Sequence, residues 1–68
     1  MTSNERMAIY KEEIRRAYRV LGADIGIQQN AIDIQLWRNY GFITAEEYHY
    51  LRCYSRSIFV VMDNIGNV

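Results

Sequence analysis

An apolar stripe near the N-terminus predicts the first helix. Thr2 is followed three residues later by Glu5, a spacing in which each side chain can satisfy a free backbone N–H of the other. Gly22 comes directly after the stripe, and glycine commonly ends helices. Hydrophobic residues recur every three or four positions between these signals, at Met7, Tyr10, Ile14, Ala17 or Tyr18, and Leu21.

The middle of the chain is apolar on more than one side. Two glycines and Asp24 between Gly22 and Gln28 favour a short connector, although residues 23–25 could also continue the helix at about 1 kcal/mol for each glycine. A second helix is expected from Gln28 to Tyr40, ended by Gly41. One face carries Ile27, Ala31, Ile34 and Trp37 or Arg38, and another carries Ile32, Leu36 and Tyr40. Such a helix normally lies between neighbours, at the centre of the fold or against another subunit.

The strongest local signal opens the third helix. Thr44 is the expected cap, Glu47 completes a capping box with it, and Ile43 and Tyr48 have the spacing of a hydrophobic staple. The helix is expected to run to about Ile65. Its apolar seam contains one small polar break, Ser55, and consists of Tyr48, Leu51, Ser55, Ile58, Met62 and Ile65.

These patterns predict an all-α fold, either a three-helix domain or a helical hairpin with a long C-terminal helix, formed by residues 1–68 as a single domain. A chain of 68 residues buries only about 60% of its unfolded surface, and small domains commonly need disulfides, metals or oligomerisation. Cys53 is the only cysteine, so a disulfide within one chain is excluded. We therefore expect a homodimer, with the surplus apolar segment from Phe59 to Ile65 as its surface.

Compartment can also be inferred from the sequence. The longest apolar run, Ile58 to Met62, is far shorter than the roughly 20 residues of a membrane helix, and residues 1–6 lack an apolar signal core. A single cysteine is typical of a reducing compartment. We expect a soluble, cytoplasmic protein with no membrane partner.

The charge balance argues against a general attraction to nucleic acid. Eight basic residues balance eight acidic ones, so any nucleic-acid contact would have to be local. Seven of the eight cations are arginine, the cation favoured at protein and phosphate interfaces. The candidate contacts to nucleic acid or to an acidic partner are Arg15, Arg16, Arg19, Arg52 and Arg56. Glu12 lies one turn before Arg15 and Arg16, so local i,i+3 and i,i+4 ion pairs explain the cluster of Arg15, Arg16 and Arg19 without a ligand.

Candidate catalytic and metal-binding residues are few. His49 and Cys53 lie four residues apart, with Glu46 one turn earlier, so the three side chains could point the same way. A zinc site usually takes four ligands, however, and the chain has one His and one Cys. A thiol nucleophile would also need an orienting group and an oxyanion donor, which no motif supplies. We expect neither a metal, nor a cofactor, nor an enzymatic activity.

Aromatic residues point to a binding protein. Six tyrosines and one tryptophan are more than so small a core can hide, and these residues are enriched at interface hot spots. The candidate contacts to a partner or a second copy are Trp37, Tyr50, Tyr54, Ile58, Phe59 and Met62. The expected function is binding and modulation of a larger protein, as performed by phage- or plasmid-type regulators of transcription, replication or defence.

The alternative is a helix-turn-helix-like DNA-binding regulator. In that interpretation Gly41 marks the turn, and the helix opened by Thr44 presents His49, Arg52 and Arg56 to DNA. Glu46 and Glu47 in its first turn would then face the phosphates, and the net charge is zero. We therefore prefer a protein partner over nucleic acid.

Overall fold

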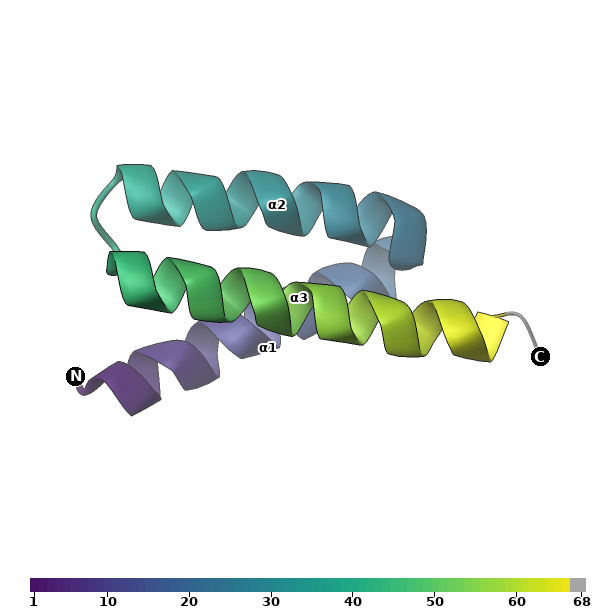
Figure 1. Ribbon diagram of the computed structural model, residues 1–68, viewed down its shortest axis with the longest axis horizontal. Coiled ribbons are helices and arrows are strands. Elements are labelled where there is room, and N and C mark those ends of the chain that lie inside the picture. The colour runs from purple at the N-terminus through teal and green to yellow at the C-terminus, as the bar shows by residue number, and fades with distance from the viewer. Residues whose placement is uncertain (67–68) are drawn as a thin grey trace.

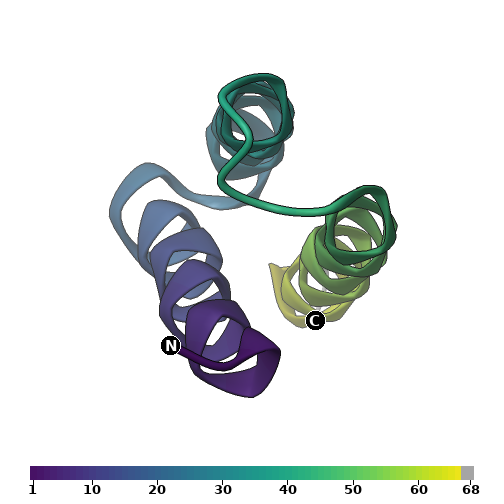
Figure 2. The same cartoon turned by 90° about the vertical axis from the view of Figure 1, so that its left-hand side faces the viewer.

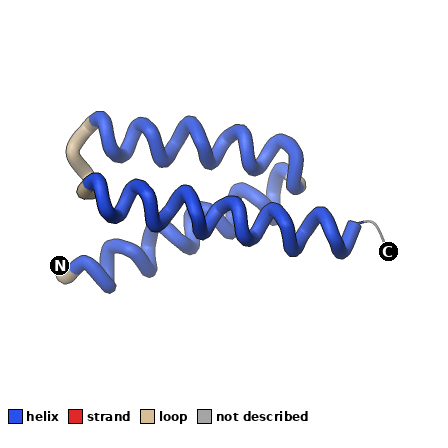
Figure 3. Tube along the Cα trace, in the orientation of Figure 1, coloured by secondary structure: helices blue, strands red, loops and turns tan. Residues whose placement is uncertain are grey.

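Three helices in sequence order make up the fold. The computed structural model describes the backbone of residues 1–66 and the side chains of residues 1–64. Helix α1 spans Ser3–Leu21, α2 spans Ala23–Asn39 and α3 spans Ala45–Gly66, with no strand in the described part of the chain. Consecutive helices run in opposite directions (Figures 1 and 3) and lie at the corners of a triangle when viewed end-on (Figure 2). The all-α prediction is confirmed, as a three-helix fold.

The corner between α1 and α2 is one residue long. Gly22 adopts a positive φ of 83°, and its N–H donates to the Tyr18 carbonyl at 2.9 Å, so the chain reverses at this single glycine. The predicted connector from Gly22 to Gln28 is therefore wrong, because α2 already begins at Ala23. Gly26 lies buried inside α2, where a Cβ atom would come within 2.8 Å of the Tyr18 ring. The second glycine thus allows two helices to approach closely and does not form a loop.

The turn between α2 and α3 follows the local signals of the sequence. Gly41 has a φ of 77°, and the Phe42 N–H donates to the Trp37 carbonyl at 2.8 Å, the 6→1 bond of a glycine-terminated helix. The Glu47 N–H donates to Thr44 Oγ1 at 3.1 Å, and the Thr44 N–H donates to Glu47 Oε1 at 2.8 Å. The predicted end of the second helix at Gly41 and the capping box are both confirmed.

The core lies along the axis of the triangle. Its fully or largely buried apolar residues come from all three helices and from the α2–α3 turn: Met7, Ile14, Tyr18, Ile34, Ile43 and Leu51. Met7 and Ile14 were predicted on the stripe of the first helix, Tyr18 as an alternative to Ala17, and Leu51 on the seam of the third. The two apolar faces of α2 differ in burial: Ile34 is buried, whereas Ile32 and Leu36 are exposed.

Buried polar groups in the core are satisfied. The Tyr18 hydroxyl donates to the Ser55 carbonyl at 2.7 Å and lies 2.9 Å from Ser55 Oγ. Asn30 is also buried, and its side-chain amide donates to the Ile14 carbonyl at 3.2 Å. Among the described side chains, no buried nitrogen or oxygen lacks a hydrogen-bond partner. The polar break that Ser55 makes in the seam of α3 therefore accommodates the tyrosine of α1.

One carboxylate joins the beginnings of α1 and α3. Glu47 is buried and accepts hydrogen bonds from the Ser3 hydroxyl at 2.6 Å and from the Arg6 guanidinium at 2.9 Å. These bonds, with that from the Thr44 N–H, favour the charged form and lower the pKa of Glu47 to about 2. Arg6 and Glu47 form the ion pair between these two helices, so the charge of Glu47 is used inside the fold.

Candidate functional site

The residues predicted to contact a partner lie mostly against the chain's own core. Trp37 is half-buried and packs on Tyr10, with ring centroids 4.5 Å apart. The other half-buried members are Tyr54, Ile58, Phe59 and Met62, all packed against the core. Tyr50 is the exposed member of the predicted set. The side chain of Ile65, also part of the predicted dimer surface, lies outside the described residues.

The two tyrosines of this set tie α3 to α1. Lys11 donates to the Tyr50 hydroxyl at 3.0 Å, and its ammonium lies 5.0 Å from the centroid of the Tyr54 ring, within the range of a cation–π contact. Arg15 donates to the Tyr54 hydroxyl at 2.6 Å. The polar ends of both tyrosines thus have partners within the chain.

The arginines of α1 are largely engaged with acidic side chains. Arg15 and Arg19 each form an ion pair with Glu12 at 2.7 Å. The i,i+3 pair with Arg15 was predicted, whereas Arg19 takes the place of the i,i+4 partner expected at Arg16. The bonds from Arg19 and then Arg15 lower the pKa of Glu12, and those from Tyr54 and then Glu12 raise the pKa of Arg15. Arg16 is exposed and, among the described residues, has no acidic group within 4.0 Å.

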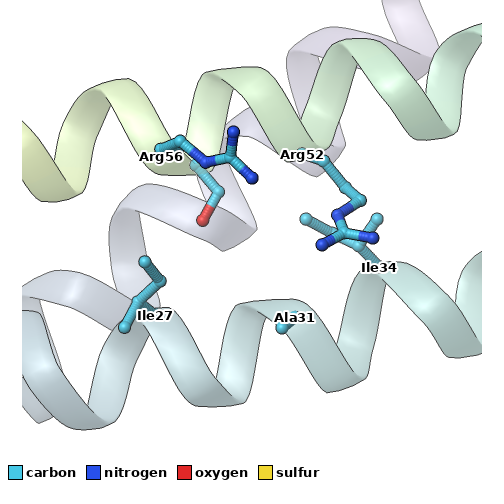
Figure 4. Close-up of a pocket in the computed structure, with 6 residues that line it drawn as sticks. Ile27, Ala31, Ile34, Arg52 and Arg56 are labelled. Carbon is cyan, nitrogen blue, oxygen red and sulfur yellow. The ribbon is translucent and has the colours of Figure 1, made fainter.

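The arginines of α3 lie over a groove between α2 and α3. A hollow of about 60 Å³ opens there, lined by both arginines. Figure 4 shows the side chain of Arg52 reaching from α3 towards α2, while that of Arg56 lies along α3. Arg52 donates to the Tyr48 hydroxyl at 2.8 Å. Within the described part of the chain, neither guanidinium has a carboxylate within 4.0 Å. These two cations are therefore available to an external anion.

The floor of this α2–α3 groove is apolar. Ile27 and Ala31 line it from α2 and are half-buried and exposed respectively, while Ile34 closes it from below. Ser55 also lines it, although its hydroxyl is engaged by Tyr18. The hollow has room for the tip of one aliphatic side chain. An apolar floor beside two guanidinium groups that have no carboxylate partner among the described residues suits a ligand that carries both an aliphatic group and a negative charge.

The candidate metal ligands lie on α3, and the helix-turn-helix interpretation concerns how α2 and α3 are arranged. Cys53 is exposed, and residues 1–64 contain no cluster of three or more His, Cys, Asp or Glu side chains suited to a metal ion. His49 instead packs edge-on against the Tyr48 ring at 5.3 Å. Helices α2 and α3 lie antiparallel along their length (Figure 1), whereas helix-turn-helix motifs join helices that cross at about 90–120°.

Sequence reasoning found the two arginines of the groove but not its floor. Ile27, Ala31 and Ile34 were assigned to one face of the second helix, yet the pattern does not show that Arg52 and Arg56 lie opposite them. Such a pairing depends on how α2 and α3 pack, which no local motif records.

Comparison with known proteins gives no relative of this chain. Family models, curated proteins and solved structures give no match to the chain. In the described part of the chain, none of the helices combines the length and the hydropathy that a membrane span requires.

Proposed function

We propose that this chain is a small binding module that modulates a larger protein, and that the α2–α3 groove receives an acidic segment of that protein. The observation that carries the proposal is the pair Arg52 and Arg56, which line a hollow with an apolar floor and have no carboxylate within 4.0 Å among the described residues. Arginine offers a planar set of donors that binds carboxylates in pairs of hydrogen bonds. Carboxylates of the partner would bind the two guanidinium groups, and an aliphatic side chain of the same segment would fill the hollow.

The charge distribution supports a protein partner over DNA. The chain as a whole is neutral, so long-range attraction to a polyanion is weak. Glu46 is exposed in the first turn of α3, on the helix that carries both arginines. A short acidic peptide needs only the local positive charge of the groove, whereas a duplex would also meet this acidic end.

The test is capture of a partner by matched charge variants. The tagged chain is exposed to an extract of its native host, and any captured protein is then purified and mixed with it to measure stoichiometry and Kd. Arg56→Glu reverses one cation of the groove, and Arg16→Glu makes the same change at an exposed arginine outside it. Ala31→Trp blocks the hollow without changing charge. We expect binding to be lost in Arg56→Glu and in Ala31→Trp and kept in Arg16→Glu.

Two results would contradict the proposal. A partner that binds the Arg56→Glu and Ala31→Trp variants as tightly as the original chain does not use the groove. Steeply salt-dependent binding of the purified chain to random duplex DNA, abolished by Arg52→Ala and Arg56→Ala, would instead establish the DNA-binding alternative.

A further inference from the structure

The face of α2 that points away from the bundle carries no charge. Figure 2 shows α1 and α3 on one side of α2, which leaves its opposite side without a neighbour. We call this the outer face of α2; all of its members are exposed, and they are Ile25, Gln28, Gln29, Ile32, Gln35, Leu36 and Asn39. Depletion of charge is the compositional mark of the core of a protein interface. The exposed aliphatic side chains therefore lie in a setting suited to a partner.

The three aliphatic residues of the outer face have a self-complementary spacing. Ile25, Ile32 and Leu36 are 60%, 55% and 42% exposed. If two copies of α2 pack antiparallel about a twofold axis beside residues 31 and 32, Ile32 meets its own copy near the axis. Ile25 then lies opposite Leu36 of the second copy, since each residue advances the helix by about 1.5 Å. The same register places Gln28 opposite Gln35 of the second copy.

Charges on the side of α2 that faces α3 fit the same register. Asp24 and Arg38 are exposed at opposite ends of α2, about four helical turns apart and thus on the same side of the helix. Neither has an oppositely charged group within 4.0 Å among the described residues, and Arg38 makes only a 3.5 Å hydrogen bond to the Ile43 carbonyl. An antiparallel pair brings Asp24 of each copy beside Arg38 of the other, whereas a parallel pair leaves Asp24 and Arg38 of the two copies at opposite ends of the interface.

We infer that the outer face of α2 is the interface of an antiparallel, twofold homodimer. Ile32 lies at its centre, with one Ile25–Leu36 contact on each side. Two Asp24–Arg38 ion pairs, one at each end, lie along the same flank. The interface differs from the surface near Phe59 to Ile65 that the apolar seam of the third helix favoured. Because α3 lies on the Asp24 and Arg38 flank of α2, the dimer presents both α2–α3 grooves on the same side.

The first test compares two aspartate variants by sedimentation equilibrium at micromolar concentrations. Ile32→Asp places a charge at the centre of the interface, and Val60→Asp makes a similar change at a side chain of α3 that is 51% exposed. We expect the original chain and Val60→Asp to be dimers and Ile32→Asp to be a folded monomer by circular dichroism. A monomeric original chain, or a dimer lost in Val60→Asp and kept in Ile32→Asp, would overturn the inference.

A charge-reversal test keeps the inference falsifiable if Ile32→Asp fails to fold. Asp24→Arg and Arg38→Asp each put two like-charged pairs in the homodimer, which should weaken its Kd by about tenfold or more. Mixing the two variants creates a heterodimer in which both pairs are again complementary. Recovery of dimer on mixing supports the antiparallel register. Single variants that dimerise as tightly as the original chain, or a mixture that remains monomeric, would contradict it.

Discussion

The hydroxyl of Tyr18 on α1 and the backbone and side chain of Ser55 on α3 form a polar contact inside the core. Tyr18 is 1% exposed, and its hydroxyl donates to the Ser55 carbonyl while accepting from Ser55 Oγ, 2.9 Å away. The small serine leaves space for the tyrosine ring, and the tyrosine satisfies the serine hydroxyl. The pair therefore sets the position of α1 along α3.

Tyr18→Phe is expected to lower the free energy of unfolding by about 1–2 kcal/mol, because it leaves the buried Ser55 hydroxyl without its partner. Ser55→Ala should cost less in the Tyr18→Phe background than in the original chain, since the orphaned hydroxyl is then removed. Urea denaturation of the four members of this cycle gives the coupling. Additive changes would show that the two groups do not depend on each other.

Gly26→Ala is expected to destabilise the fold by about 1–2 kcal/mol, although alanine is the better helix former. The new Cβ would lie 2.8 Å from Cδ1 and 3.1 Å from Cα of Tyr18, so α1 and α2 would have to separate. Ala31→Gly, at an exposed site on the same helix, measures the difference in helix propensity between alanine and glycine apart from the contact with Tyr18. Thermal or urea melts in which Gly26→Ala is more stable than the original chain would refute this explanation of the glycine.

The stability of the fold should fall as the pH is lowered from about 5 towards 2. The pKa of Glu47 in the folded chain is about 2, below its unfolded value, so its contribution is present above the unfolded pKa and is lost on protonation. Glu47→Gln removes the charge and keeps a single acceptor oxygen, so it can accept from the Thr44 N–H or from the Ser3 hydroxyl but not from both. We expect this variant to be less stable at pH 7, on the order of 2 kcal/mol, with the difference vanishing near pH 2. A difference independent of pH would indicate that the charge is not what stabilises the contact.

Helix ends set by neighbouring residues could be predicted from the sequence. Thr44 and Glu47 exchange their two hydrogen bonds within one turn, and Gly41 ends α2 through bonds to the turn before it. The pairing of Glu12 with Arg15 is local in the same way. These contacts form between residues a few positions apart, so residue type and spacing are enough to specify them.

The start of α2 and the different surroundings of the arginines could not be predicted in this way. Gly26 looks like a loop residue in sequence, and only the approach of Tyr18 from α1 explains its place inside a helix. Arg19 and Arg56 are also alike in sequence, yet one is paired with Glu12 and the other lies over the α2–α3 groove. Their roles depend on which side chains of other turns and helices come close.

The two apolar faces of α2 follow from its sequence alone, because hydrophobic residues recur at helical spacing on both. That Ile34 enters the core while Ile32 and Leu36 remain exposed is a result of the packing of the three helices. Both faces satisfy the same periodicity, so the pattern along the chain does not distinguish them. The choice follows from where α1 and α3 pack, since burial is a property of the whole arrangement of helices and not of any one of them.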